Sequence, residues 1–172
     1  MYEFKPQRTN DKARKLIVLF FAGAAALFLL TVPLEGVPFL WVIQLLAILL
    51  LVVAVFLVTR YVTKTYEYAV EPTDDGADLT VTEISSGGKR RIVVCRISLS
   101  GIESVRAIVG KDEELSAIRK ARRKIFDYRI DVAPEKSILA VANEGGEEYI
   151  LLFAYDDEFL SILERNENER DI

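Results

Sequence analysis

Two long uncharged apolar runs near the N-terminus constrain this chain more than any other feature of its sequence. The first run is Leu16–Val32 and the second is Phe39–Thr59. As α-helices that rise about 1.5 Å per residue, they would be roughly 25 Å and roughly 31 Å long, close to the hydrocarbon thickness of a bilayer. We therefore predict two transmembrane helices at these positions.

A short loop joins the two apolar runs and sets their relative direction. Residues 33–38, PLEGVP, contain two prolines and a glycine, which end a helix. So short a loop allows only antiparallel neighbours, so the pattern predicts a helical hairpin.

Basic residues predict how the hairpin is oriented. The loop has none and carries Glu35, whereas basic residues flank the other ends of both runs. Because Lys and Arg favour the cytoplasmic side, we expect a multi-pass protein of the plasma (inner) membrane with both termini in the cytoplasm. The flanking basic residues are Lys5, Arg8, Lys12, Arg14, Lys15, Arg60 and Lys64.

A cleaved signal peptide is the alternative interpretation of the first run. That run is long for the apolar core of a signal peptide, and the residues TVPLEG that end it offer no A-x-A cleavage site. The second run would remain as a membrane span in either case.

Gln44 is the one strongly polar residue inside the second run. An amide within a membrane needs a hydrogen-bond partner, so we predict an intramembrane polar contact here. Two alternatives stay open: the amide bonds to a backbone carbonyl within the hairpin, or it contacts a second copy of the chain. Small residues at Ala22–Ala26 permit close approach of the helices.

The remainder of the chain alternates polar and apolar residues over short segments. Turn sequences such as EPTDDGAD, SSGG and EGGE separate these segments. A period of two with turns at short spacing is typical of an antiparallel sandwich or barrel. The predicted strands are Thr63–Val70, Leu79–Ile84, Lys89–Ile97, Ile102–Val109, Ile125–Val132, Ile138–Asn143 and Tyr149–Ala154.

After the seventh strand the apolar period becomes helical. Asp156 is a good N-cap, and the acidic residues that follow it suit the first turn of a helix. The predicted apolar face of this helix is formed by Phe159, Leu160, Ile162 and Leu163.

This order of elements resembles that of the bacterial membrane-anchored pleckstrin-homology-like (PH-like) proteins, in which two spans precede such a domain. The hairpin carries the resemblance together with Tyr66–Val70, Arg90–Ile108 and Tyr149–Leu163. In that family an I-x-L-x-x-I-x-x-V corner joins the third and fourth strands. The matching residues here are Ile97, Leu99, Ile102 and Val105.

The resemblance implies an α+β membrane protein in three parts. A cytoplasmic basic N-terminal segment, 1–15, precedes the transmembrane hairpin, 16–59, and a cytoplasmic PH-like domain, 60–172, follows it. The domain would be a seven-stranded β-sandwich or barrel of two nearly orthogonal sheets, closed by the C-terminal α-helix. The chain lacks the family's Thr-x-x-Arg before the second strand and inserts a charged segment between strands four and five, which leaves the subfamily open.

The inserted segment, Lys111–Lys124, begins with acidic residues and ends in RKARRK. Its pattern predicts a short amphipathic helix. Arg119 and Arg123 are four residues apart, as are Lys120 and Lys124, and like charges at this spacing destabilise a helix by roughly 0.2–0.5 kcal/mol. We therefore expect these basic residues to have partners outside the helix.

Three kinds of partner suit the basic segment 119–124. They are carboxylates elsewhere in the domain, the anionic headgroups of the lipid bilayer, and nucleic acid. Nucleic acid is disfavoured, because from residue 60 onward the chain has 17 basic and 23 acidic residues and no aromatic residue interrupts the cluster. The candidate lipid- or partner-binding residues are Arg119, Lys120, Arg122, Arg123 and Lys124, with Lys89, Arg90 and Arg91 of the GGKRR turn.

The sequence offers no catalytic arrangement. It has no histidine and a single cysteine, Cys95, in an apolar run that predicts a buried structural thiol. No residue pattern indicates a cofactor or a metal. We therefore expect a non-catalytic binding module, which scaffolds a protein partner or a second copy of itself at the inner face of the membrane. Anionic-lipid recognition through 119–124 is the alternative.

Overall fold

The computed structural model describes residues 2–8, 11–33, 38–74, 76–85, 87–110 and 124–170, the side chains of 167–170 excepted. It divides into two compact units. The helical unit is Asn10–Lys64, and the β unit combines Met1–Thr9 with Thr65–Ile172. The β unit is therefore discontinuous in sequence, because the helical unit is inserted between its first strand and the rest.

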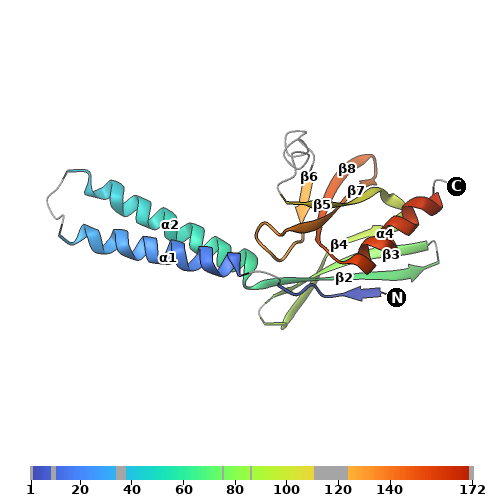
Figure 1. The fold of residues 1–172 in the computed structure, drawn as a ribbon, viewed down its shortest axis with the longest axis horizontal. Coiled ribbons are helices and arrows are strands. Elements are labelled where there is room, and N and C mark those ends of the chain that lie inside the picture. The colour runs from blue at the N-terminus through green and yellow to red at the C-terminus, as the bar shows by residue number, and fades with distance from the viewer. Residues whose placement is uncertain are drawn as a thin grey trace. The chain divides into compact units, whose positions relative to one another are not determined.

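The helical unit is an antiparallel pair of helices, α1 (Lys12–Thr31) and α2 (Leu40–Tyr61), which lie side by side in Figure 1. Their buried residues recur at intervals of four or seven residues, so that one narrow seam of each helix faces the other. Several of the residues in this seam are small, which lets the backbones approach closely. The buried residues of the seam are Ala13, Ile17, Ala24, Thr31, Ala47 and Ala54.

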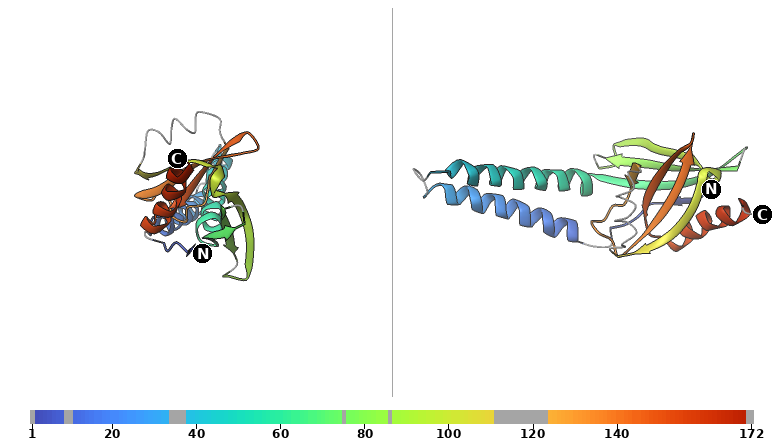
Figure 2. Two further views of the ribbon diagram at one scale, coloured as in Figure 1. Left: turned by 90° about the vertical axis from the view of Figure 1, so that its right-hand side faces the viewer. Right: turned by 90° about the horizontal axis from the view of Figure 1, so that it is seen from above.

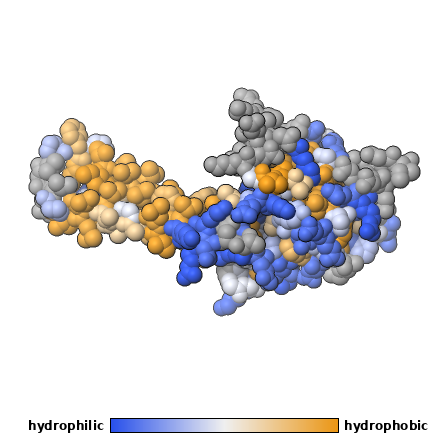
Figure 3. All heavy atoms as spheres, viewed as in Figure 1, coloured by the Kyte–Doolittle hydropathy of each residue, from blue (hydrophilic) through white to orange (hydrophobic). Residues whose placement is uncertain are grey.

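Away from the seam, both helices expose large apolar side chains. Leu29, Leu45 and Phe56 are 60–72% exposed, and Figure 3 shows apolar residues over most of the helical surface. By length and composition, both helices suffice to cross a membrane. Gln44 also lies on the exposed surface of α2, outside the seam, and its predicted intramembrane contact stays a prediction.

The β unit contains two four-stranded sheets, whose strands cross at a steep angle in Figure 2. Sheet A has the order β1-β2-β3-β4, and sheet B has the order β5-β7-β8-β6. The bounds in sheet A are β1 Tyr2–Phe4, β2 Lys64–Thr73, β3 Gly76–Ser85 and β4 Arg90–Ser98. Those in sheet B are β5 Ile102–Val109, β6 Lys124–Asp127, β7 Lys136–Glu144 and β8 Glu147–Ala154.

A short 3₁₀ turn, η1 (Leu99–Gly101), forms the corner between the two sheets. The four apolar positions of the corner sequence are all buried in the core, as the resemblance implies; they are Ile97, Leu99, Ile102 and Val105. Close packing favours glycine at position 101, because a Cβ there would lie 3.1 Å from the carbonyl oxygen of Asn143 on β7.

The C-terminal helix α4 (Asp157–Arg170) covers the core between the sheets. Its start confirms the predicted cap: the Asp156 carboxylate accepts a hydrogen bond of 2.9 Å from the backbone N–H of Phe159. Phe159 and Leu163 are buried in the core, and Leu160 and Ile162 pack against it as partly buried residues.

The observed fold corrects the prediction of seven strands, because the described residues of the β unit form eight. The added strand is β1, which pairs antiparallel with β2 in the register Tyr2↔Val70 and Phe4↔Tyr68. The basic residues after it suggested a polar N-terminal segment. However, Tyr2 and Phe4 alternate with a charged residue and pack against the core, which is the pattern of a half-buried strand.

The fifth predicted strand, Ile125–Val132, is also shorter than expected, because β6 ends at Asp127. It pairs parallel with β8, which corrects the prediction of an entirely antiparallel arrangement. The Asp127 carboxylate accepts a hydrogen bond from the backbone N–H of Arg129 (3.1 Å) and pairs with its guanidinium (2.7 Å). This local side-chain bond competes with the sheet pairing and turns the chain. The helix predicted for Lys111–Lys124 lies outside the described residues apart from Lys124, which begins β6.

Candidate functional site

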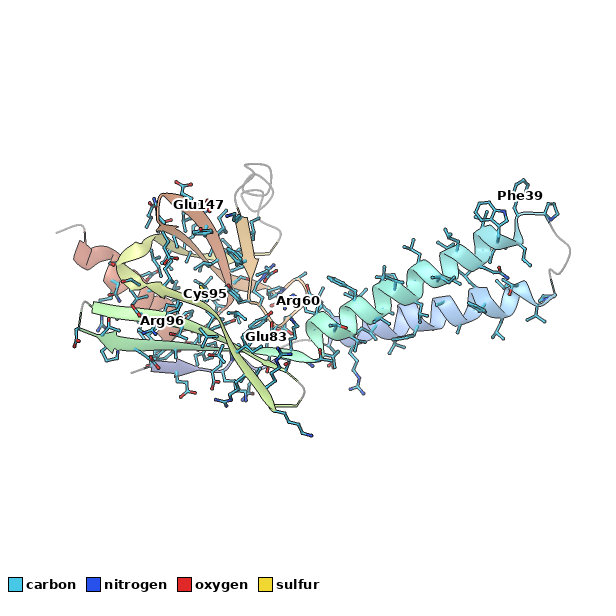
Figure 4. The ribbon with its side chains drawn as sticks, turned by 180° about the vertical axis from the view of Figure 1, so that it is seen from behind. Phe39, Arg60, Glu83, Cys95, Arg96 and Glu147 are labelled. Carbon is cyan, nitrogen blue, oxygen red and sulfur yellow. The ribbon has the colours of Figure 1, made fainter. Side chains whose placement is uncertain are left out.

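Of the predicted basic cluster 119–124, the structure describes only Lys124. The positions of Arg119, Lys120, Arg122 and Arg123 lie outside the described residues. Lys124 pairs with the Glu147 carboxylate at 2.6 Å, and its ammonium lies 5.5 Å from the ring centroid of Tyr149. Figure 4 labels Glu147 at the end of the β7–β8 hairpin.

The Lys124–Glu147 pair is electrostatically self-consistent. The hydrogen bond to Glu147 raises the pKa of Lys124, and the same bond, with a second one from the Tyr149 hydroxyl, lowers the pKa of Glu147. Each group therefore favours the charged form of the other. Both are solvent-exposed, so the pair contributes little to stability and leaves Lys124 with a carboxylate of its own domain as partner.

The second predicted basic group lies at the tip of the β3–β4 hairpin. Lys89 belongs to the turn, and Arg90 and Arg91 begin β4; all three are exposed. Arg91 makes a long ion pair of 3.5 Å with Glu67 of β2, and its own side chain stays 62% exposed. The structure thus describes two separate basic positions, Lys124 on sheet B and Lys89–Arg91 on sheet A.

The basic turn is followed directly by exposed apolar residues. Ile92, Val93 and Val94 of β4 are 39%, 57% and 40% exposed. The sequence predicted a β-strand over this β-branched run but not its exposure. Among the described strands, β4 lies at the edge of sheet A, which leaves one of its sides unpaired.

Cys95 follows on β4 and is half-buried against the core (Figure 4). Burial raises the pKa of its thiol, although its hydrogen bond with Tyr128 acts in the opposite direction. A raised pKa leaves less thiolate at neutral pH, so Cys95 is a poor nucleophile and a packing residue.

The side chain at the centre of the core is Tyr68, which the sequence analysis placed in the predicted strand Thr63–Val70 without assigning it a role. It is fully buried, and its hydroxyl donates to the carbonyl of Tyr128 (2.9 Å) and accepts from the N–H of Ala154 (3.2 Å). Its ring packs against Phe153 and Phe159 at 5.2 and 5.3 Å between centroids. Tyr68 therefore links both sheets and α4.

The N-terminal strand is held by a second tyrosine. The hydroxyl of Tyr2 donates to the Asp156 carboxylate at 2.7 Å, and its ring stacks on Phe159 with 6.0 Å between centroids. Burial, with this hydrogen bond, raises the pKa of Tyr2 above its ordinary value. Asp156 thus caps α4 and anchors β1 at the same time. In the sequence, the signal for β1 is the alternation of apolar and charged residues in YEF, residues 2–4.

Beside Tyr2, two carboxyl groups meet across β1 and β2. The hydrogen bond between Glu3 and Glu67, followed by the repulsion between their charges, raises the pKa of Glu3; Arg91 and Lys5 oppose the shift. Glu67 is itself buried and pairs with Arg91. The Glu3 carboxyl therefore holds its proton more readily than an isolated glutamate does.

The described residues contain no group of three or more metal-ligating side chains. These residues form an edge strand, β4, with exposed basic and apolar side chains, and an N-terminal strand, β1, that pairs with β2. Two four-stranded sheets that meet at an apolar corner and are covered by a C-terminal helix define the class of PH-like domains, which are generally non-enzymatic binding modules.

A comparison with protein families agrees with this class. Residues 4–169 match the family described as bacterial PH-like domain (DUF6106), and the chain belongs to this family. The match includes both helices of the helical unit and nearly the whole β unit. No curated protein and no solved structure matches the chain.

Proposed function

We propose that this protein is a non-catalytic, membrane-tethered PH-like domain that binds a protein partner at the inner face of the plasma membrane. The observation that carries the tether is the pairing of β1 with β2. These strands lie on either side of the helical unit in the sequence, so its two ends start and finish in one folded domain. A hairpin inserted in a membrane would therefore have both ends on the same side.

The surface and the flanking charges of the helices support insertion. A helix pair that exposes residues such as Leu45 and Phe56 in water would leave a large unfavourable apolar surface. Basic residues precede α1 and end α2, whereas the loop between them carries only Glu35 as a charge. This asymmetry favours the cytoplasmic side for the β unit and both termini.

The absence of histidine and the raised pKa of Cys95 support a binding role over a catalytic one. PH-like domains are generally binding modules, and the β unit offers exposed strand edges that a protein partner can use. The proposed partner is either another protein or a second copy of this chain.

The tether is tested by labelling single cysteines in intact bacteria. In a Cys95→Ser background, we expect Glu35→Cys to react with a membrane-impermeant maleimide from outside and Ser161→Cys to react only after permeabilisation. The protein should also stay in the membrane fraction after a carbonate wash. Reaction of Ser161→Cys in intact cells, or recovery of the whole chain without detergent, contradicts the proposal.

Protein binding is tested by chemical crosslinking in membranes and purification in several mild detergents. A discrete crosslinked adduct that survives purification is expected. Isolated monomers in every detergent would contradict a scaffolding role.

Anionic-lipid recognition is the second candidate, favoured by the three consecutive exposed basic residues Lys89–Arg91. Basic residues close to an anionic leaflet gain about 1 kcal/mol each. If this role is correct, the charge reversals Arg90→Glu and Arg122→Glu should weaken the association of the β unit with anionic vesicles and leave neutral vesicles unaffected. Equal association with both vesicles contradicts it.

A further inference from the structure

The described part of the β unit gathers its exposed apolar side chains on one strand. Five large apolar side chains of this unit are prominently exposed, and three of them, Ile92–Val94, are consecutive in β4. Scattered single apolar residues on a surface are ordinary, but three in succession on one strand give both faces of that strand exposed apolar side chains that a partner can contact. The other two are Val109 and Phe126.

β4 is also an edge strand. It pairs with β3 on one side, and no described strand of sheet A pairs with its other side. It is nine residues long and contains no proline. Natural edge strands of this length usually carry features that prevent further pairing. Two such features are present on β4: its exposed arginines, and a register shift that leaves Val94 as an extra residue opposite Val81 and Thr82.

The shift leaves a regular stretch on its N-terminal side. Arg90–Val93 pair in unbroken register with β3, from Ser85↔Arg90 to Thr82↔Val93. The outer backbone N–H and C=O groups of this stretch are thus arranged for one more strand. Both faces of the stretch are exposed, so an added strand would contact side chains on either side.

The charges of β4 disfavour the register in which the apolar centres of two copies of the strand would pair. An antiparallel pair of two β4 strands centred between Val93 and Val94 would place Arg91 of one copy opposite Arg96 of the other. Like charges directly opposite each other destabilise a strand pair. The sequence KRRIVVCR is basic on both sides of its apolar centre, so its complement is acidic on both sides.

The arginines are available for such a complement. Arg91 and Arg96 pair with Glu67 (3.5 Å) and Asp78 (2.9 Å), but their side chains are 62% and 61% exposed. Exposed ion pairs of this kind are weak and can be shared with a further carboxylate. Lys89 and Arg90 make no ion pair with any described residue.

A membrane surface would satisfy the basic and apolar side chains but not the backbone. In the hydrocarbon region each unpaired N–H or C=O costs several kcal/mol, and an exposed strand edge carries a row of them. An extended peptide satisfies these groups and the side chains together. The combination of edge, apolar centre and basic flanks therefore favours a peptide over a lipid.

We propose that the outer edge of β4, Arg90–Val94, is the docking strand for an extended segment of a partner protein, in which apolar residues alternate with Asp or Glu. The inference rests on the protein-binding role proposed above and gives that role a location and a ligand chemistry.

The probe for the test is a fluorescent peptide of alternating Glu and Val, with the full-length chain in nanodiscs of zwitterionic lipid. We expect saturable binding by anisotropy, and slower amide hydrogen exchange at residues 90–94 when the peptide is bound. Val93→Glu should weaken binding by about tenfold or more, because it buries a like charge. Val109→Glu is the matched control: the same change at an exposed valine of β5 should leave binding unchanged.

Two further peptides test the chemistry. The same peptide with every backbone amide methylated, and a Lys-Val peptide, should both fail to bind. Binding of the methylated peptide excludes strand pairing, and equal binding of the Lys-Val peptide excludes charge complementarity. Either result overturns the proposal.

The remaining outcomes distinguish a failure of the β4 docking proposal from a failure of the proposed protein-binding function. No peptide binding, with exchange at 90–94 slowed only in discs of anionic lipid, assigns β4 to the membrane and overturns the proposal. An adduct formed in membranes that persists in Val93→Glu and is lost in Val109→Glu overturns the β4 edge but leaves the protein-binding function standing.

Discussion

At the scale of single residues, two tyrosine hydroxyls connect segments that the sequence separates widely. The Tyr68 hydroxyl joins β2 to the chain after β6 and to the end of β8, and the Tyr2 hydroxyl joins β1 to the start of α4. The sequence predicted a strand that contains Tyr68 and a helix cap at Asp156, because both follow from local spacing. It could not predict the partners of either hydroxyl, because those partners are set by how the two sheets meet.

Replacing Tyr68 by Phe tests the first of these links. The change keeps the ring and leaves the Tyr128 carbonyl and the Ala154 N–H without their partner in the core. We expect a loss of about 1–3 kcal/mol in the free energy of unfolding, measured by denaturant titration of the purified protein in detergent.

Tyr155→Phe is the control for Tyr68→Phe, because it removes an exposed hydroxyl that bonds Asp157 at 2.6 Å. Its expected effect is within about 0.5 kcal/mol. Equal losses for the two variants would mean that the hydroxyl of Tyr68 contributes no more than a surface group.

At the scale of elements, the strands and the final helix follow from period and turn chemistry, whereas β1 and the end of β6 do not. Both exceptions depend on contacts with distant or competing groups: Tyr2 and Phe4 need sheet A and α4 to pack against, and the Asp127 carboxylate ends β6 at Arg129. The candidate site shows the same contrast between features set by local sequence and features set by tertiary structure. The basic turn 89–91 was predicted from composition, but the exposure of Ile92–Val94 depends on β4 being the edge of its sheet.

We expect the raised pKa of Glu3 to make the stability of the folded protein dependent on pH. Because the pKa of Glu3 is raised in the folded protein, the folded state binds its proton more tightly than the unfolded state. Stability from this source is present at low pH and is lost as the pH rises through the ordinary glutamate range to the raised pKa. Glu3→Gln should therefore raise the Tm at pH 7 and have no effect well below pH 4.

A Tm series over pH measures this difference, with the exposed Glu144→Gln as the matched control. The idea is wrong if Glu3→Gln lowers the Tm at neutral pH, since attraction to Arg91 and Lys5 would then outweigh the repulsion from Glu67.

At the scale of the whole molecule, the β unit is assembled from two pieces of chain on either side of the helices. We expect residues 65–172 alone to be less stable than the same unit in the full chain, because Asp156 and Phe159 lose their contacts with Tyr2. A synthetic peptide of residues 1–9 should restore stability, since a ligand that binds only the folded state raises the Tm with its concentration.

The same peptide with Tyr2→Ala is the control for this complementation and should raise the Tm much less. Equal shifts with both peptides, or none with either, would show that β1 contributes no specific contact to the unit.

The order of these pieces has a consequence for biosynthesis. Translation produces β1 first, then the two helices, and only then its pairing partner β2. If the helices are inserted into a bilayer as proposed, β1 can pair with β2 only in molecules whose N-terminal residues stay on the cytosolic side. Completion of the sheet would then act as a proofreading step, in which a wrongly inserted copy keeps an unfinished domain that quality-control proteases can recognise.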